Sequence, residues 1–448
     1  MNEFFGSVWW LIVTLGLLVT FHEFGHFIVA RLCGVKVLRF SVGFGKPLWM
    51  RRDRRGTEFA IAAIPLGGYV KMLDEREAEV APEELDQAHN RKPVGQRMAI
   101  AAAGPAFNLI FTVFAFWLMF VVGKPDFLPI VDAPTGVAAE AGMSAGDRIT
   151  AIDGSAVDSW SKALQKLGED AVGRFDSRVE VTTASGASAT RTLAFSTLPA
   201  DVGEDQLFEK IGLRLQPRER EPVIGVVADG KPAAAAGLAV GDRVLRINGR
   251  DIANFSDIER IVPEEAARDP EIDLVVQRGD EQLDLRMTAT QVEAADGTSR
   301  YIIGIGSRVA HDAVQQYGPF AAIPRAFAET WDVTKSSLGM LKMLVVGRAS
   351  LENLSGPITI ARFANGSAQM GLAWFLNFLA IISLSLAIIN LLPIPILDGG
   401  HLLYYLIELI KGSPVSDRTQ IFGQYAGLMM LVALMGLAFY NDILRLIP

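Results

Sequence analysis

The sequence predicts a polytopic α-helical membrane protein with four transmembrane helices, a membrane-associated β-rich cytoplasmic loop and a soluble insert in which an α+β domain is repeated. Two global observations support this fold class: 50% of the 448 residues are hydrophobic, and the mean hydropathy is +0.29. The third is that the apolar residues lie in long uncharged runs, since a bilayer core of about 30 Å requires about 20 of them. A single cysteine excludes a disulfide scaffold, and the net charge of −8 offers no basis for a nucleic-acid partner.

The predicted membrane spans are four apolar runs, at residues 7–30, 98–122, 374–397 and between Arg418 and Asp442. The last three carry no charged residue, whereas the first contains His22, Glu23 and His26. The first run has no Lys or Arg before it and no small-x-small cleavage site before Arg31. We therefore expect a retained signal anchor.

The distribution of basic residues predicts the orientation. The connection between the first two runs is rich in Lys and Arg, whereas residues 1–8 contain neither and the C-terminal tail has only Arg445. We therefore expect this connection to be cytoplasmic. Both termini and the insert between the second and third runs would then lie on the opposite side.

The insert repeats itself with an offset of 95 residues, as Ala141–Gly154 matches Ala236–Gly249. The second copy reads Ala-Gly-Leu-Ala-Val-Gly-Asp-Arg-Val-Leu-Arg-Ile-Asn-Gly. Each copy should continue through a helical stretch into a hairpin, 179–183 with 191–195 and 274–277 with 283–287. A short closing strand is expected in each copy, at Ile211–Leu213 and Ile303–Ile305.

This motif makes both copies resemble PDZ domains. The resemblance implies that an extended peptide can bind by adding a strand to a sheet edge. Neither copy has a clear Gly-Leu-Gly-Phe carboxylate loop, and Ile224-Gly225-Val226 is the nearest candidate. The alternative is that both copies are spacers that no longer bind peptides.

The first span contains His22-Glu23-Phe24-Gly25-His26, a His-Glu-x-x-His motif. On a helix the two histidines are one turn apart on one face, so both imidazoles can reach one Zn²⁺. Glu23 is then the catalytic general base. A purely structural role is a poor alternative, because a carboxylate inside a membrane span is costly without a partner or a function.

A catalytic zinc usually has three protein ligands. The third run ends in Asn390-Leu-Leu-Pro-Ile-Pro-Ile-Leu-Asp398-Gly-Gly, where Pro393 and Pro395 cannot continue a regular helix. The predicted topology brings Asp398 to the same membrane face as His26, and we therefore expect Asp398 to be the third ligand.

Together, the His-Glu-x-x-His and Asn-x-x-Pro-x-Pro-x-x-Asp-Gly motifs resemble the site-2 protease family of intramembrane zinc metalloproteases, over nearly the whole chain. The resemblance implies that His22, His26 and Asp398 bind one Zn²⁺ per chain, that Glu23 is the acid/base, and that Asn390 contacts the substrate backbone. It also implies a multi-pass bacterial inner-membrane protein of the envelope stress response. Implied substrates are a pre-trimmed anti-sigma factor and remnant signal peptides, with the PDZ pair as a size filter.

The cytoplasmic loop should form strands at residues 38–45, 58–64 and 67–72. A sheet beside the active site could pair with an unwound substrate segment, although a structural hairpin or a membrane-surface anchor is an equal alternative. Further candidate substrate contacts lie in this loop, at the break and in the second span: Gly43, Gly45, Gly67, Gly68, Pro393, Pro395 and Asn108. A packing role for Asn108 is equally open. We expect His401 not to be a ligand, and His89 and His311 to be solvated.

The predicted membrane helices are residues 1–32, 97–123, 374–400 and 419–448, the last including the C-terminal tail. The cytoplasmic parts are a β-loop at 33–96 and a loop at 401–418. The PDZ domains are residues 124–220 and 221–310, and an amphipathic linker on the periplasmic surface follows at 311–373. The predicted function is endoproteolysis of single-pass membrane proteins within the bilayer, by a monomer. One alternative is a membrane-tethered PDZ scaffold with a vestigial metal site. A metal transporter is disfavoured, because the second and fourth spans offer almost no polar path.

Overall fold

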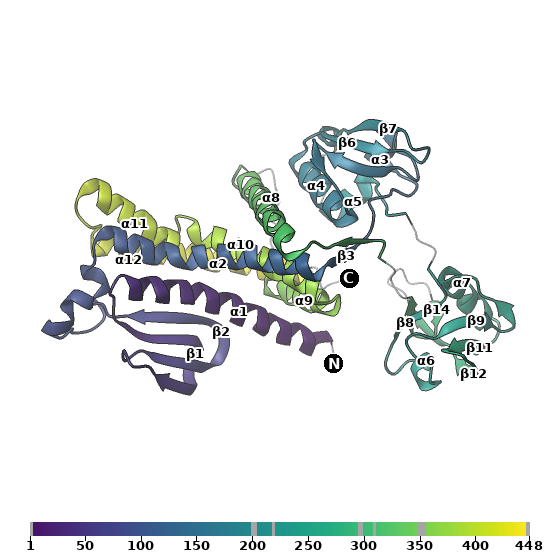
Figure 1. The fold of residues 1–448 in the computed structure, drawn as a ribbon, viewed down its shortest axis with the longest axis horizontal. Helices are drawn as coiled ribbons and strands as arrows, with labels where there is room; N and C mark the ends of the chain where they lie inside the picture. The colour runs from purple at the N-terminus through teal and green to yellow at the C-terminus, as the bar shows by residue number, and fades with distance from the viewer. Residues whose placement is uncertain are drawn as a thin grey trace. The chain divides into compact units, whose positions relative to one another are not determined.

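The computed structural model describes residues 3–198, 204–216, 220–293, 299–307, 311–346 and 355–444. The chain divides into two compact units, residues 1–125 with 314–447 and residues 126–313 (Figure 1). The first unit contains the long apolar helices and the second contains the two sequence repeats.

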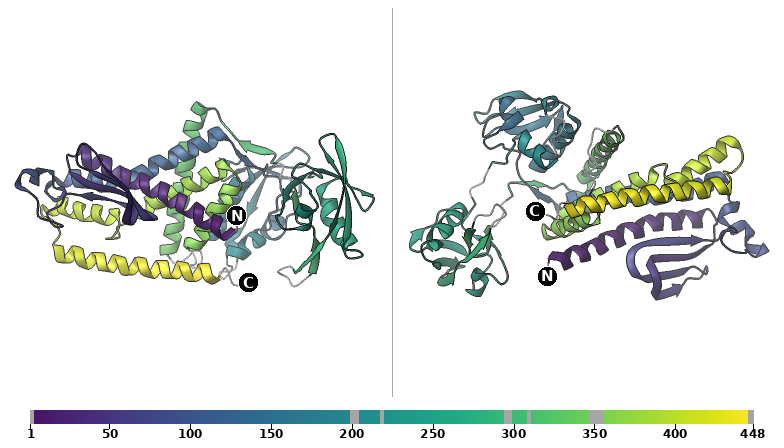
Figure 2. Two further views of the ribbon diagram at one scale, coloured as in Figure 1. Left: turned by 90° about the horizontal axis from the view of Figure 1, so that it is seen from below. Right: turned by 180° about the vertical axis from the view of Figure 1, so that it is seen from behind.

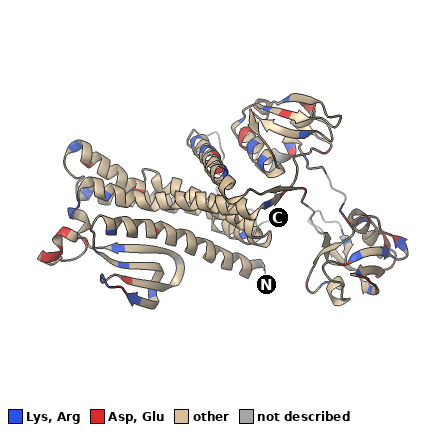
Figure 3. Cartoon of the chain, viewed as in Figure 1, with Lys and Arg blue, Asp and Glu red and all other residues tan. Residues whose placement is uncertain are grey.

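Helices dominate the first unit: α1 (Glu3–Leu32), α2 (Val94–Val122), α8 (Pro319–Val345), α9 (Pro357–Gln369), α10 (Leu372–Leu391), α11 (Asp398–Lys411) and α12 (Asp417–Leu444). Four of them, α1, α2, α10 and α12, are long and apolar enough to cross a membrane. Figure 3 shows that these helices carry very few charged residues. They correspond to the four predicted runs.

Small residues and hydroxyl groups hold these helices together. A Cβ atom on Gly25 of α1 would lie 2.4 Å from the carbonyl oxygen of Ala103 in α2, so the two backbones approach closely only because Gly25 has no side chain. Between α2 and α10, the Ser383 hydroxyl donates a 2.9 Å hydrogen bond to the Asn108 carbonyl oxygen. The stretch of α2 from Ala103 to Asn108 is thus fixed against both neighbours.

The segment after the third apolar run differs from the prediction. The third predicted helix is present, but it ends at Leu391 instead of residue 400, at the break that the prolines predicted. The predicted loop 401–418 was wrong over its first part, because residues 398–411 form helix α11. The prolines at 393 and 395 lack the N–H that continued helix needs, which explains the stop at Leu391. The predicted linker 311–373 contains two helices, and α8 packs on α2 with a 2.8 Å hydrogen bond from Trp117 Nε1 to the Pro319 carbonyl.

Two long strands, β1 (Val37–Arg52) and β2 (Glu58–Met72), form the loop between α1 and α2 and lie along α1 (Figure 2). Phe40 is paired with both Val70 and Phe59, so the first half of β1 lies between the two ends of β2. This confirms the predicted strands, while the second half of β1 is an additional strand segment. The Phe40 and Phe59 rings pack against Phe27 of α1, with centroids 5.4 and 5.5 Å away. Two short 3₁₀ helices follow, Pro82–Gln87 and His89–Arg91.

The two repeats have the same sheet topology. The first contains α3 (Gly136–Glu140), β4 (Arg148–Ile152), β5 (Ser155–Ala156), α4 (Trp160–Gly173), β6 (Ser177–Thr182), β7 (Ser188–Leu193), the 3₁₀ helix Phe195–Thr197 and α5 (Glu204–Ile211). The second contains β8 (Ile224–Val227), α6 (Pro232–Ala235), β9 (Arg243–Ile247), β10 (Arg250–Asp251), α7 (Phe255–Ala266), β11 (Glu271–Arg278), β12 (Glu281–Thr288), β13 (Thr290–Glu293), β14 (Ser299–Ile302) and β15 (Ile305–Ser307). The strand orders are β5-β4-β6-β7 and β10-β9-β11-β12, and the predicted hairpins are present. A further strand pair, β3 (Lys124–Asp126) with β16 (Ala313–Gln315), lies where the insert begins and ends.

The repeated Gly-Asp motif has a structural role in both copies. The Asp147 carboxylate accepts a 2.9 Å hydrogen bond from the backbone N–H of Ser144, and Asp242 accepts one of 2.8 Å from Ala239. Both aspartates are buried. The motif therefore closes the turn before β4 and β9, which explains why its sequence recurs.

The predicted closing strands were only partly correct. Ile211 ends α5 and Gly212 has a φ of +73°, so no strand covers 211–213. In the second copy Gly304 has a φ of +81° and separates β14 from β15. A positive φ interrupts an extended strand, and glycine adopts it readily. Ile224-Gly225-Val226 lies in β8, paired with β15, and is not a loop.

Candidate metal centre

The His-Glu-x-x-His motif lies in α1, near its C-terminal end. One helical turn separates the two histidines, and their Nε2 atoms are 3.2 Å apart. The imidazole of His26 is buried, and its Nδ1 lies 2.8 Å from the carbonyl oxygen of Ile100 in α2. Because a carbonyl oxygen can only accept, Nδ1 carries the proton and Nε2 retains its lone pair.

His22 is oriented by a residue of α2 that lies two turns beyond Ile100. Its Nδ1 lies 3.2 Å from the side-chain amide of Asn108, a buried residue. The amide oxygen of Asn108 has no hydrogen-bond partner among the residues that the structure describes. A half-turn of the amide lets this oxygen accept from Nδ1–H of His22, which leaves Nε2 free to bind a metal.

Asp398 is the first residue of α11, directly after the proline-containing break. Its Oδ2 atom lies 3.1 Å from Nε2 of His22 and 3.5 Å from Nε2 of His26. The glycines that follow make this position possible. A Cβ on Gly399 would lie 2.2 Å from the Leu392 carbonyl oxygen, and one on Gly400 would lie 2.3 Å from that of Ile394.

These three side chains fit a zinc ion. With both histidines protonated on Nδ1, the three facing atoms of His22, His26 and Asp398 are all acceptors, and such atoms repel one another unless a cation lies between them. A tetrahedral zinc with bonds of about 2.1 Å places its ligand atoms roughly 3.4 Å apart, close to the observed 3.1, 3.2 and 3.5 Å. Among the described residues, these form the only group of three potential ligands gathered within 4.8 Å.

Gly104 of α2 lies directly against both imidazoles. A Cβ atom at this position would be 2.3 Å from Nε2 of His26 and 2.6 Å from Nε2 of His22. In the sequence, Gly104 is one glycine within an apolar run and gives no local signal of such a role. The structure shows that the space left by its missing side chain is occupied by the candidate ligands.

Glu23 faces the end of β2. A Cβ atom on Gly68 would lie 3.5 Å from Cγ of Glu23, and Glu23 and Val70 line the same cavity. Within the described part of the chain, residues 68–72 pair only with β1, so their other edge is unpaired. The candidate base therefore lies at a strand edge that an extended peptide could join.

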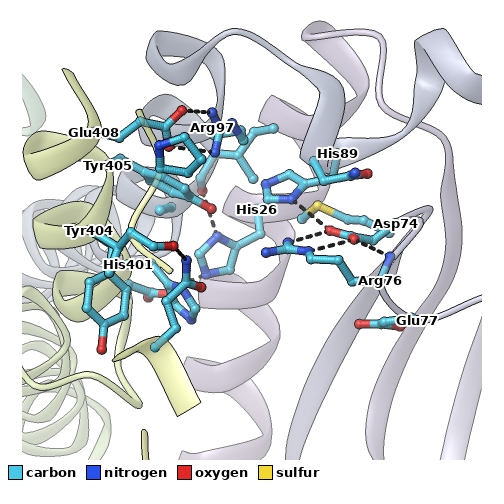
Figure 4. A pocket seen from close by; sticks show the side chains of 18 of the residues that line it. His26, Asp74, Arg76, Glu77, His89, Arg97, His401, Tyr404, Tyr405 and Glu408 are labelled. Carbon is cyan, nitrogen blue, oxygen red and sulfur yellow. Dashed lines mark hydrogen bonds and ion pairs between the residues drawn. The ribbon is translucent and has the colours of Figure 1, made fainter. Parts of the chain in front are cut away.

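A cavity of about 1010 Å³ opens beside Glu23, His26 and Asp398. Figure 4 shows His26 among the other residues that line it. Its other walls contain both apolar and polar side chains, and most of the charged groups in them are paired. Arg76 and His89 both contact Asp74, at 2.6 and 3.5 Å. Burial alone would raise the pKa of Asp74, but these hydrogen bonds hold it well below its usual range. Only 15% of the His89 side chain is exposed and it is paired with Asp74, so the prediction of a solvated imidazole was wrong.

The remaining candidate residues are distributed more widely. Gly43 and Gly67 adopt positive φ values where the sheet bends, and their nearest contacts are with Ile64 and Phe44. Gly45, also at a positive φ, faces the side chain of Ile64. Of the four loop glycines, only Gly68 has Glu23 among its nearest contacts.

The candidate residues around the proline break lie at the end of α10 and beside α12. Asn390 occupies the last turn of α10, and its side chain has no hydrogen bond among the described residues. Pro393 follows the end of this helix, while Pro395 packs against Gly423 of α12. His401 lines the large cavity but is not part of the group of three candidate ligands.

Comparison with known proteins identifies the family. The model of peptidase family M50 matches residues 10–434. The chain is 49% identical over 449 residues to a Xylella fastidiosa protein named "Putative zinc metalloprotease", covering 99% of this chain and all of that protein. It is 42% identical to the Regulator of sigma-E protease RseP of Escherichia coli and 41% identical to that of Salmonella typhimurium, covering 97% of this chain and 98% of each relative. The chain therefore belongs to peptidase family M50, the site-2 proteases, and is a zinc metalloprotease of that type.

Proposed function

We propose that this intramembrane protease cuts single-pass membrane proteins with one zinc ion held by His22, His26 and Asp398. The observation that carries the proposal is the convergence of these three acceptor atoms, from helices far apart in the sequence, beside Glu23. When bound, zinc polarises the scissile carbonyl as a Lewis acid. His22 and His26 keep their Nε2 atoms available because Asn108 and Ile100 engage the opposite ring nitrogens.

Glu23 is the proton-transfer residue in this proposal. Its carboxylate takes a proton from the attacking water and delivers it to the leaving amine, so one group acts first as base and then as acid. The substrate lies extended along residues 68–72 of β2, since peptide hydrolysis requires an unwound and exposed amide. Gly68 permits this approach because it places no side chain between the strand edge and Glu23.

The substrates follow from the relatives and from the arrangement of the sequence. Relatives are named regulators of sigma-E, which supports an anti-sigma factor already trimmed outside the membrane as one substrate. Remnant signal peptides are another, since they are also short membrane spans. We place the basic β1–β2 region in the cytoplasm, and the termini and the PDZ-like repeats in the periplasm. The repeats would then exclude substrates that retain bulky outer domains.

The test of catalysis is cleavage of a tagged single-span substrate by the purified full chain in detergent. Glu23→Gln should abolish cleavage while the zinc content remains equal to that of the wild type. Glu77→Gln is the matched control, because this exposed carboxylate lines the same cavity and is not among the candidate ligands. Equal cleavage by wild type and Glu23→Gln, both loaded with zinc, would contradict the role of Glu23, whereas no cleavage by the zinc-loaded wild type would favour a peptide-binding scaffold.

The size filter needs a separate experiment. The same span is presented with a short outer tail or with a folded outer domain, and cleavage is compared between the full chain and a chain lacking residues 126–313. The deletion should increase cleavage of the substrate with the folded outer domain and leave cleavage of the short-tailed substrate unchanged. Unchanged selectivity after deletion would contradict the filter while leaving the protease intact.

A further inference from the structure

We propose that the ion pair between Arg97 of α2 and Glu408 of α11 is a positioning device that holds Asp398 in place for the metal. The inference rests on the proposed metal site and adds residues outside it. Arg97 Nη2 donates to Glu408 Oε1 at 2.6 Å, and Nη1 donates to Oε2 at 3.1 Å (Figure 4). A bidentate pair of this kind fixes orientation as well as distance.

The pair is sheltered and held in place from both sides. The exposed fractions of the two side chains are 14% for Arg97 and 17% for Glu408. Arg97 also donates a 2.9 Å hydrogen bond from Nε to the Lys92 carbonyl, and its guanidinium lies 4.9 Å from the ring centre of Tyr405. Because it is sheltered from solvent, the Arg97–Glu408 pair differs from an exposed surface ion pair, which contributes little to stability.

Neither charge favours the helix that carries it. Arg97 lies in the first turn of α2, where the helix dipole disfavours a cation, and Glu408 lies near the C-terminal end of α11, where it disfavours an anion. Their placement is therefore explained by the contact between the two helices and not by the stability of either helix.

Helix α11 has few buried residues. Its buried residues are Gly399 and Gly400, at the end that carries Asp398, whereas apolar side chains further along, such as Ile410, are exposed. A 14-residue helix is about 21 Å long, so a tilt of about 5° displaces one end relative to the other by roughly 2 Å. Ligand distances in metal sites vary by only about 0.2 Å, so the distal end of α11 must be fixed.

Arg97 lies on the same face of α2 as the residues that contact the two histidines. Residues 97, 100, 104 and 108 are spaced by three or four and form one stripe of the helix. Ile100 orients His26, Gly104 makes room for both imidazoles and Asn108 orients His22. Arg97 lies on the same stripe and pairs with Glu408 of α11, the helix that carries Asp398. One face of α2 would thus set the position of all three.

The test measures zinc affinity and needs no substrate. Full-length protein in detergent is stripped of metal and titrated with zinc against a chelating dye. Arg97→Gln and Glu408→Gln should each bind zinc about tenfold more weakly, as do variants of groups that support metal ligands. The exchanged double variant Arg97→Glu/Glu408→Arg should recover most of this loss, because it restores the pair with both charges now favoured by the helix dipoles.

The matched control is Arg91→Gln. Arg91 makes an equally bidentate pair with Glu75, at 2.7 and 2.9 Å, but 48% of its side chain is exposed and neither residue belongs to α2 or α11. Its zinc affinity should equal that of the wild type. Cleavage assays should show a lower kcat with an unchanged KM in the Arg97 and Glu408 variants, because neither residue lies along the proposed substrate strand.

Two results would overturn the inference. One is a zinc affinity of Arg97→Gln and Glu408→Gln equal to that of Arg91→Gln. The other is no recovery in the exchanged variant although its metal-free melting temperature equals that of the wild type. If Arg97→Gln does not fold, Glu408→Gln carries the same comparison. Failure of the wild-type chain itself to bind zinc would instead contradict the proposed metal site.

Discussion

Replacing Gly104 by alanine is the sharpest test of the metal centre. The new Cβ would lie 2.3 Å from Nε2 of His26 and 2.6 Å from Nε2 of His22, whereas ordinary contacts begin near 3.4 Å. The imidazoles or the helix must therefore move by about 1 Å, the difference between 3.4 Å and these distances. Helix α2 cannot easily yield, because the Ala103 carbonyl already lies against Gly25 of α1.

A displacement of this size exceeds the tolerance of a metal site, which is about 0.2 Å. We expect Gly104→Ala to bind zinc at least about 100-fold more weakly, equivalent to roughly 2.7 kcal/mol. Alanine favours helix by about 1 kcal/mol relative to glycine, so the helix itself should not be weakened. The assay is zinc titration of the metal-stripped full chain, together with melting temperatures with and without zinc.

Gly95→Ala is the control on the same helix, since a Cβ there meets no atom within 4 Å. It should bind zinc like the wild type. If Gly104→Ala bound zinc as tightly as Gly95→Ala, the two histidines could not share a metal at the described position, and the proposed ligand geometry would be refuted.

Three further predictions concern the surroundings of the site and the second repeat. Asn108→Ala should weaken zinc binding about tenfold by freeing the imidazole it orients, and an unchanged affinity in the same titration would contradict that role. Gly68→Ala places a Cβ 2.7 Å from the Ser41 carbonyl oxygen and should lower kcat with zinc content unchanged, whereas full activity would argue against substrate lying along this edge. Hydrogen bonds from Arg278 and the Ala239 backbone lower the pKa of Asp242, so this carboxylate stabilises the second repeat above about pH 4 and the contribution is lost as the pH falls further. Amide hydrogen exchange of the full chain should show weaker protection of this repeat in Arg278→Met at pH 7 and a smaller change on acidification, and equal profiles would exclude the linkage.

Much of the architecture follows from local patterns in the sequence. The four apolar helices are visible as uncharged runs, and the repeated domain is visible as the Gly-Asp motif, whose buried carboxylates Asp147 and Asp242 close the same turn twice. The helix α11 was missed because its first turn contains Gly399 and Gly400, which read as a turn. These glycines are needed instead for close contact with the preceding backbone.

The sequence by itself determined the chemistry of the first two candidate ligands, because His22 and His26 lie one turn apart on any helix. It also indicated Asp398, through a proline break that had to end the preceding helix. Only the tertiary structure could show that Ile100, Gly104 and the Arg97–Glu408 pair bear on the site. A backbone carbonyl, an absent side chain and an ion pair between distant helices leave no local pattern. Their contacts with the candidate ligands exist only when α1, α2 and α11 are packed together.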